Sequence, residues 1–131
     1  MTALDICTTF LAIRLKLEVN DELLKREICA LFDASSKSDF THKLNRKFLN
    51  DALLEKKYRA WCNKLMFDVL SEDEIYSLVG ADRLHKFSKS LQVFPSVVST
   101  ALIELLPVIV SRFGEDFSNI EPINKARLKK Y

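Results

Sequence analysis

The side chains that could carry out chemistry are few in this 131-residue chain, and they are widely separated. A zinc site needs about four converging nitrogen or sulfur ligands, whereas His42 and His85 have no cysteine or second histidine at ligand spacing. The chain contains no GxSxG sequence, no glycine-rich phosphate loop and no HExxH sequence. We therefore predict a protein that is not an enzyme and holds no metal or cofactor, with both histidines on its surface.

The cysteines point to a structural role. Cys7, Cys29 and Cys62 are an odd number at wide spacing, without a CxxC pair. Each lies in a segment of helical apolar periodicity, where a thiol behaves as a small hydrophobic side chain. The pattern predicts buried, reduced cysteines in a cytoplasmic protein. Since the N-terminal stretch has no basic segment and no cleavage pattern, no signal peptide is expected.

Charge is unevenly placed along the chain, although the net charge is only +2. Residues 37–64 hold eight basic and three acidic residues, a net +5, and residues 68–82 hold five acidic residues and no base. Such separation indicates either complementarity within the fold or a surface for a partner. The candidate partner-binding residues are Asp68, Glu72, Asp73 and Glu74 on the acidic segment and Lys43, Arg46, Lys47, Lys56, Lys57 and Arg59 on the basic one. The alternative interpretation is that the basic residues form a solvated helix face and the acids a helix start.

The scarcity of glycine and proline indicates the fold class. Two glycines and three prolines are too few for the turns of a β-sandwich or barrel. With 48% hydrophobic and 29% charged residues, the composition is that of an ordinary globular domain. We predict a single all-α domain over residues 1–131, a compact bundle of six to seven helices around one buried central helix.

The segment 95–113 is predicted to be that central helix. Glu104 is the only formal charge between Lys89 and Arg112. Because an acid near the middle of a membrane span costs about 2.5–3.5 kcal/mol, we interpret the segment as a core helix and expect no membrane contact. Pro107 should kink the helix or split it into 95–105 and 107–113. Apolar residues recur at three- and four-residue steps, namely Val97, Val98, Ala101, Leu102, Leu105, Leu106, Ile109 and Val110.

The N-terminal half is predicted to hold helices over about 3–18, from 21 to near 33, and over about 40–70. Thr2 with Asp5 forms a capping pair for the first, and Asn20 caps the second. The segment 33–39 is expected to be a loop, and Asn50 could break the third region and cap a helix of 51–67. The expected buried stripes are Ile6, Phe10, Ile13 and Leu17 in the first helix, Leu24, Ile28, Leu31 and Phe32 in the second, and Leu54, Tyr58, Trp61 and Leu65 in the last.

Helix boundaries are easier to recognise in the C-terminal half of the sequence. Ser71 and Glu74 form a capping box that predicts a short helix ending at Gly80. A helix follows over 81–91, and Pro95 suits the first position of the next. The segment 84–102 therefore has the spacing of a helix-turn-helix motif. DNA affinity depends chiefly on neutralising phosphates, yet the second helix would offer only Ser96, Ser99 and Thr100, so we interpret the motif as structural.

Residues 77–113, SLVGADRLHKFSKSLQVFPSVVSTALIELLPVIVSRF, resemble the bacterial YidB-like domain. The resemblance implies an all-helical fold with a homeodomain-like core and no established biochemical activity. Within the single domain we therefore expect a YidB-like core at 71–114, N-terminal helices at 1–70 that have no counterpart in the family, and a C-terminal tail at 115–131. Three positions depart from the family pattern: Gln92 replaces the turn glycine, Phe94 replaces the serine before the proline, and Gly114-Glu115-Asp116 replaces Pro-x-Gly. The matching residues are Gly80, Leu84, Leu91, Val93, Pro95, Val98, Leu106, Pro107 and Val110.

These features favour a non-catalytic bacterial protein-binding module whose partner is another protein. An immunity-type protein, which neutralises a partner by covering a cationic cleft with an acidic patch, is one form of this hypothesis. The alternative is a helix-turn-helix DNA-binding regulator, helped by the basic residues Lys125, Arg127, Lys129 and Lys130.

Overall fold

The computed structural model describes residues 1–114, and within them it contains seven α-helices, one 3-10 helix and no strand. This confirms the all-α class and the predicted number of helices. The expected tail at 115–131 lies outside the described residues. In chain order the elements are α1 (Ala3–Arg14), α2 (Asp21–Leu31), the 3-10 helix η1 (Lys37–Asp39), α3 (Phe40–Leu49), α4 (Ala52–Cys62), α5 (Glu72–Val79), α6 (Ala81–Leu91) and α7 (Pro95–Phe113).

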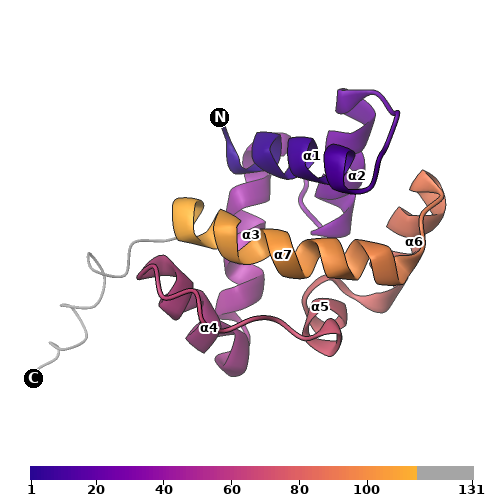
Figure 1. Cartoon of the computed structure of the whole chain (residues 1–131). Helices are drawn as coiled ribbons and strands as arrows, with labels where there is room; N and C mark the ends of the chain where they lie inside the picture. The colour runs from indigo at the N-terminus through magenta and orange to yellow at the C-terminus, as the bar shows by residue number, and fades with distance from the viewer. Residues whose placement is uncertain (115–131) are drawn as a thin grey trace, which may run out of the picture.

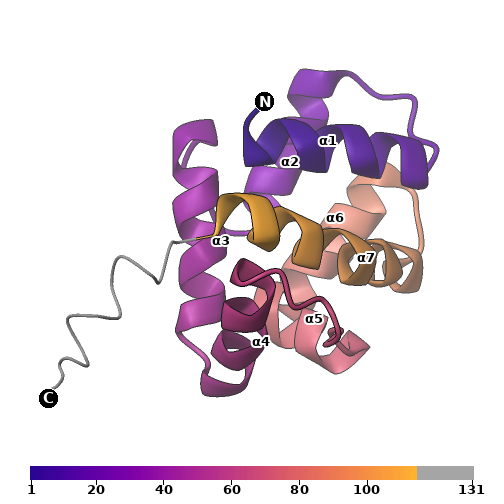
Figure 2. The ribbon, with the colours of Figure 1, turned by 60° about the vertical axis from the view of Figure 1, so that its left-hand side comes forward.

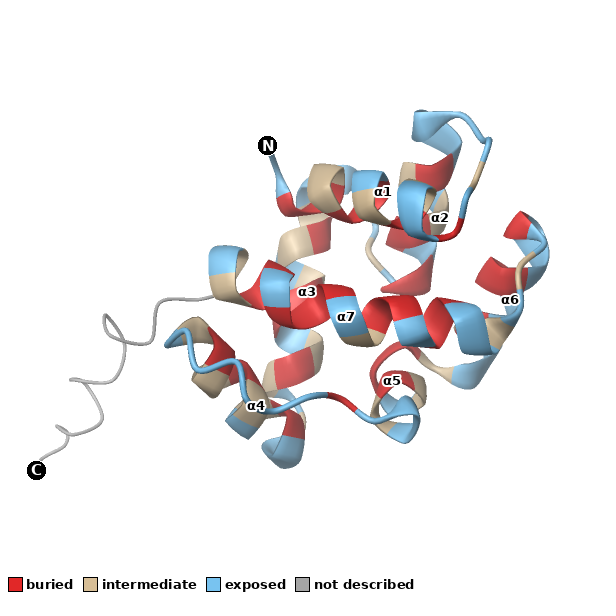
Figure 3. Ribbon diagram, viewed as in Figure 1, coloured by how far each residue is buried: buried red, intermediate tan, exposed pale blue. Residues whose placement is uncertain are grey.

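Helix α7 is the centre of the bundle, as predicted. It crosses the molecule with α1 on one side and α4 and α5 on the other, and it contacts α1, α4, α5 and α6 (Figures 1 and 2). Seven of the eight expected apolar residues of α7 are buried, and only Val97 is exposed. Figure 3 shows buried residues in red along most of the length of α7. By length and composition α7 could also cross a membrane, a test that core helices pass as well.

Pro107 does not split α7. The helix runs without interruption for 19 residues, with Pro107 inside it and buried. Proline in a helix interior removes one backbone donor and crowds the preceding turn. Apolar packing on several sides of α7 compensates for this local cost, since helices in proteins are stabilised mainly by tertiary contacts. The expected division into 95–105 and 107–113 is therefore wrong.

Four helices end in the same way, and none of them uses glycine. Lys16, Asp33, Lys64 and Gln92 all have positive φ, between 55° and 65°. After each of them the next amide donates to a carbonyl five residues back, for example Leu17 N to Ala12 O at 2.9 Å and Leu65 N to Ala60 O at 2.8 Å. This is the Schellman pattern, which satisfies carbonyls that a helix end leaves without partners.

These endings correct two predicted boundaries. Helix α1 ends at Arg14, not at 18, and α4 ends at Cys62, not at 67 or 70. Residues 63–70 form a loop between α4 and α5, in which only Leu70 is buried. The segment 33–39, expected to be a loop, contains the short 3-10 helix η1.

The helix starts agree closely with the sequence. Capping boxes at Thr2 and Ser71 are both present, and Asn20 Oδ1 accepts from the first-turn amides of α2. One cap differs, because the carboxylate of Asp51, not the side chain of Asn50, accepts from the amides of Leu53 and Leu54 in α4. Gly80, with φ 88°, ends α5 and also begins α6.

The core faces agree in part. All four expected residues of α2 are buried, and so are Leu54, Tyr58 and Trp61 of α4. The expected stripe of α1 is confirmed only in part: Ile6, Phe10 and Leu17 are partly buried and pack against the core, whereas Ile13 is exposed. Since α1 packs against α2, α3 and α7, its buried residues are Ala3, Leu4, Cys7, Thr8 and Leu11.

Cys7 and Cys29 are buried, as predicted, whereas Cys62 has intermediate exposure. Burial raises the pKa of the Cys7 thiol to about 12 and also raises the pKa of Cys29. A thiol at such a pKa is almost entirely protonated at neutral pH and is a poor nucleophile.

Candidate interaction surfaces

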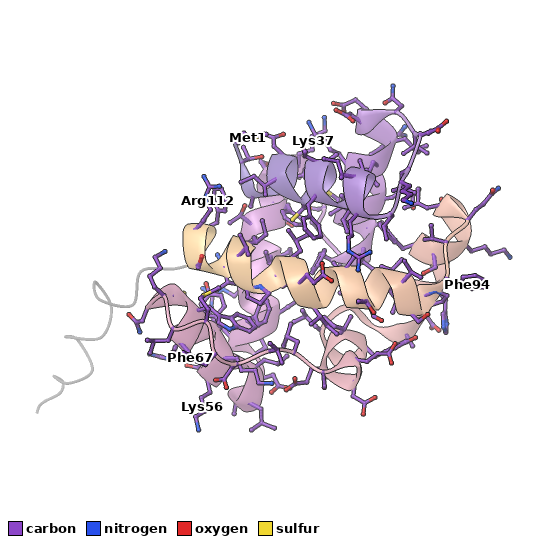
Figure 4. The ribbon with its side chains drawn as sticks, in the orientation of Figure 1. Met1, Lys37, Lys56, Phe67, Phe94 and Arg112 are labelled. Atoms are coloured by element: carbon purple, nitrogen blue, oxygen red, sulfur yellow. The ribbon has the colours of Figure 1, made fainter. Side chains whose placement is uncertain are left out.

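The loop between α4 and α5 exposes a run of apolar side chains. Phe67 is 89% exposed and Leu65 is 51% exposed, although Leu65 was expected in a buried stripe. Figure 4 labels Phe67 on this loop, far from Phe94 at the other end of α7. We define the apolar loop patch as Leu65, Met66, Phe67 and Val69, all of which are exposed.

Although its side chains are exposed, the backbone of this loop is held at several points. The indole Nε1 of Trp61 donates to the carbonyl of Asp68 at 3.0 Å, and Lys57 Nζ donates to the carbonyl of Val69 at 2.7 Å. Lys64 Nζ donates to the carbonyl of Ser111 near the end of α7. The apolar loop patch is thus presented on a preorganised backbone, which lowers the entropy lost when a partner binds.

Part of the predicted charge separation is satisfied within the fold. Lys57 Nζ lies 2.7 Å from Glu74 Oε1, so one residue of the basic segment pairs with one of the acidic segment. Burial raises the pKa of Glu74, but hydrogen bonds from Lys57 and Ser71 outweigh this and hold the pKa below its usual value. Arg59 pairs with Glu55 of its own helix at 2.8 Å.

The acidic side chains near the apolar loop patch differ in their availability. Asp68 and Asp73 are exposed, and their carboxylates form no hydrogen bond or ion pair with the described residues. Glu72 accepts a 2.9 Å hydrogen bond from Ser99 Oγ. Asp68 lies within the loop itself, so an acidic charge sits among the exposed apolar side chains.

On the basic segment, Arg46 and Lys56 are exposed and Lys43 is half-buried. None of the three forms a hydrogen bond or ion pair with residues 1–114. Surface cations of this kind contribute little to folding. They are equally consistent with a solvated helix face and with a partner surface.

Lys47 differs from the other basic candidates because it lines a cavity of about 280 Å³. An adjoining cavity of about 180 Å³ is lined in part by Asp73 and Glu74. The structure therefore brings together three candidate residues that the sequence assigned to opposite surfaces. The walls of the first cavity are Lys47, Asn50, Asp51, Leu54, Ser77, Leu78 and Arg83.

The two helices of the segment 84–102 are α6 and α7, and the second of them is the buried centre of the bundle. Ser99 is 0% exposed, and its hydroxyl donates to Glu72 and to the carbonyl of Ser96. Thr100 is exposed, but its hydroxyl donates to the same carbonyl at 2.8 Å. Helix α7 contacts four other helices, and the residues that it exposes before Arg112 include Glu104 but no lysine or arginine that could neutralise phosphates.

The histidines lie on the surface, as predicted, and the ring of His85 stands edge-on to Tyr76 at 6.2 Å. Among residues 1–114 there is no group of three or more histidine, cysteine, aspartate or glutamate side chains that could hold a metal ion. Comparison with protein-family models, curated proteins and solved structures finds no significant match. The resemblance to the YidB-like domain, with its homeodomain-like core, therefore stays a prediction.

Sequence reasoning missed two features of these surfaces. The apolar loop patch was expected to be helical, with Leu65 in a buried stripe, because no glycine or proline marks the end of α4. Arg83 was not recognised as a neighbour of Lys47, because 36 residues of chain separate them and only the fold brings α6 beside the end of α3. No local signal in the sequence gives that proximity.

Proposed function

We propose that the protein is a non-catalytic protein-binding module and that the apolar loop patch is the centre of its binding surface. The observation that supports this is the 89% exposure of Phe67 on a loop held by Trp61, Lys57 and Lys64. An exposed aromatic residue costs nothing to desolvate and gains when a partner buries it. Interface hot spots are aromatic anchors of this kind, surrounded by polar residues.

The charges around the patch favour a cationic partner. Asp68 lies within the loop, and Glu72 and Asp73 begin the helix that follows it. A partner surface with an apolar pocket and a basic rim would complement this arrangement and would be attracted over a distance. Neutralisation of a cationic protein, as an immunity-type protein does, is the specific form of this proposal. A cytoplasmic site of action is part of the same proposal.

The test is capture of a partner from a lysate of the protein's own cells, treated with nuclease, using tagged wild type and two matched variants. We expect Phe67→Ala to lose the partner that the wild type retains, because the aromatic anchor is gone. Phe94→Ala should retain it, since Phe94 is a second exposed phenylalanine, 76% exposed at the other end of α7. Equal capture by both variants, or recovery of nucleic acid alone, would refute the proposal.

Charge reversal tests the chemistry of the partner. Asp68 and Asp73 are suitable positions because neither carboxylate has a partner among the described residues, whereas Glu74 caps α5 and pairs with Lys57. We expect the double variant Asp68→Lys, Asp73→Lys to weaken capture and Arg46→Glu, Lys56→Glu to leave it unchanged. The opposite result would mean that the partner is anionic and binds the basic segment.

A further inference from the structure

We infer that the cavity between Lys47 and Arg83 is a binding site for an oxyanion, a phosphate or carboxylate group carried by a small molecule. The site is separate from the apolar loop patch and does not depend on the proposed function. Its walls come from the end of α3, the corner between α3 and α4, and the helices α4, α5 and α6. At about 280 Å³ it is close to the lower limit of ligand pockets, which suits one anionic group and its nearest atoms.

The first argument is an uncompensated positive charge. Lys47 is half-buried at the cavity wall and forms no hydrogen bond or ion pair with residues 1–114. Burial lowers its pKa, the positive charges of Arg83 and Lys43 lower it further, and only Asp33 acts in the opposite direction. Removing a charge from water is unfavourable unless the charge is paired, and a bound anion would supply a partner for Lys47.

The second argument is the geometry of Arg83. Its Nε donates to the carbonyl of Val79 at 2.7 Å, which fixes the side chain and leaves its terminal nitrogens available. A side chain at residue 80 would begin only 3.3 Å from Arg83 Nη2, so the glycine at this position leaves room for the guanidinium. Arginine binds phosphate and carboxylate groups through two parallel hydrogen bonds, and a fixed guanidinium is preorganised for this.

The third argument concerns the remaining walls. Asn50 and Ser77 add an amide and a hydroxyl that can donate to an anion. The one acid in the wall, Asp51, is already used, because its Oδ1 accepts from the amides of Leu53 and Leu54 at 3.0 and 3.2 Å. Its charge is partly offset by the positive end of the helix it caps.

The neighbouring cavity favours a small ligand over a nucleic acid. It shares Asp51, Leu54 and Ser77 with the first cavity, and it contains Asp73 and Glu74. An extended polyanion that reached Lys47 and Arg83 would meet these carboxylates and be repelled. A single anionic group can occupy the basic end alone.

The experiment is a titration of the isotopically labelled protein with inorganic phosphate, followed by amide chemical shifts, with sodium chloride keeping the ionic strength constant. We expect saturable shifts at Asn50, Ser77 and Gly80, with a Kd on the order of 1 mM. Lys47→Gln should weaken binding about tenfold or more. The matched control Lys56→Gln removes an exposed lysine that does not line the cavity and should leave Kd unchanged.

Two further readouts complete the test. Arg83→Lys keeps the charge but loses the planar guanidinium, so we expect weaker binding of phosphate in a protein whose amide spectrum is otherwise intact. Shifts that do not saturate, or that are equal in Lys47→Gln and wild type, would overturn the inference. Tighter saturable binding of a short DNA duplex at the same amides would overturn the assignment to a small ligand.

Discussion

Helix α7 and the loop that joins α4 to α5 are both rich in apolar residues, yet the fold treats them in opposite ways. In α7 the apolar residues repeat at helical spacing, and four neighbouring helices cover them. In the loop, Leu65, Met66 and Phe67 are consecutive and exposed, and only Leu70 reaches the core. In α7 the helical repeat directs apolar side chains at neighbouring helices, whereas the loop lacks such a repeat and buries only Leu70. Apolar side chains left on a fixed loop are available to a partner.

The largest expected effect is the loss of stability when a leucine of α7 is truncated to alanine, compared with the same change in the loop. Leu102 of α7 is 0% exposed, and Leu65 of the loop is 51% exposed. Leu102→Ala leaves a cavity in the core and should lower the free energy of unfolding by about 2–5 kcal/mol. Leu65→Ala should change it by about 0.5 kcal/mol or less. Urea unfolding followed by the fluorescence of Trp61, the single tryptophan, measures both, and equal losses would contradict the contrast between the regions.

A smaller effect should follow when the loop loses one of its attachments. Trp61→Phe removes the hydrogen bond to the carbonyl of Asp68 but keeps a ring that can pack edge-to-face against Phe48. We expect the unfolding free energy to fall by about 1–3 kcal/mol, from the lost hydrogen bond and the smaller ring. Hydrogen exchange should quicken more at amides 66–70 than in α7. If exchange in the loop is unchanged while stability falls, Trp61 supports the core but does not hold the loop.

The smallest expected effect is a loss of folding stability at acidic pH. The pKa of Glu74 is lowered in the folded protein, so its ion pair with Lys57 stabilises the fold above the ordinary pKa of glutamate, near 4.5, and is lost as pH falls below it. Such a pair contributes about 1 kcal/mol or less. Urea midpoints measured from neutral pH to pH 3 should fall less steeply for Glu74→Gln than for wild type. A parallel pair of curves would show that other groups account for the acid sensitivity.

Helix starts could be predicted from the sequence more accurately than helix ends. Asn20, Ser71 and Pro95 are recognisable starts, and the helices that follow them begin where expected. The ends of α1 and α4 were missed because Lys16 and Lys64 adopt the left-handed conformation that usually marks glycine. That conformation is imposed by the bonds that close each helix and by tertiary packing, neither of which the residue type reveals.

The contacts on the candidate surfaces could not be predicted from the sequence either. The sequence located the charged residues, but it could not show that Lys57 pairs with Glu74 or that Ser99 bonds to Glu72. Both contacts join different helices, so they depend on how the helices pack. Once they are known, Asp68 and Asp73 become better positions for charge reversal than Glu72 and Glu74.

The position of α7 in the chain has a consequence for synthesis. The helix that covers the apolar faces of α1, α4, α5 and α6 follows all of them in chain order. At about 5–20 residues per second, roughly 5–20 s separate the synthesis of α1 from that of α7. During this interval the earlier helices lack their common partner, and their apolar faces are open to chaperones and to other nascent chains. The core of residues 1–114 can form only when α7 has left the ribosome.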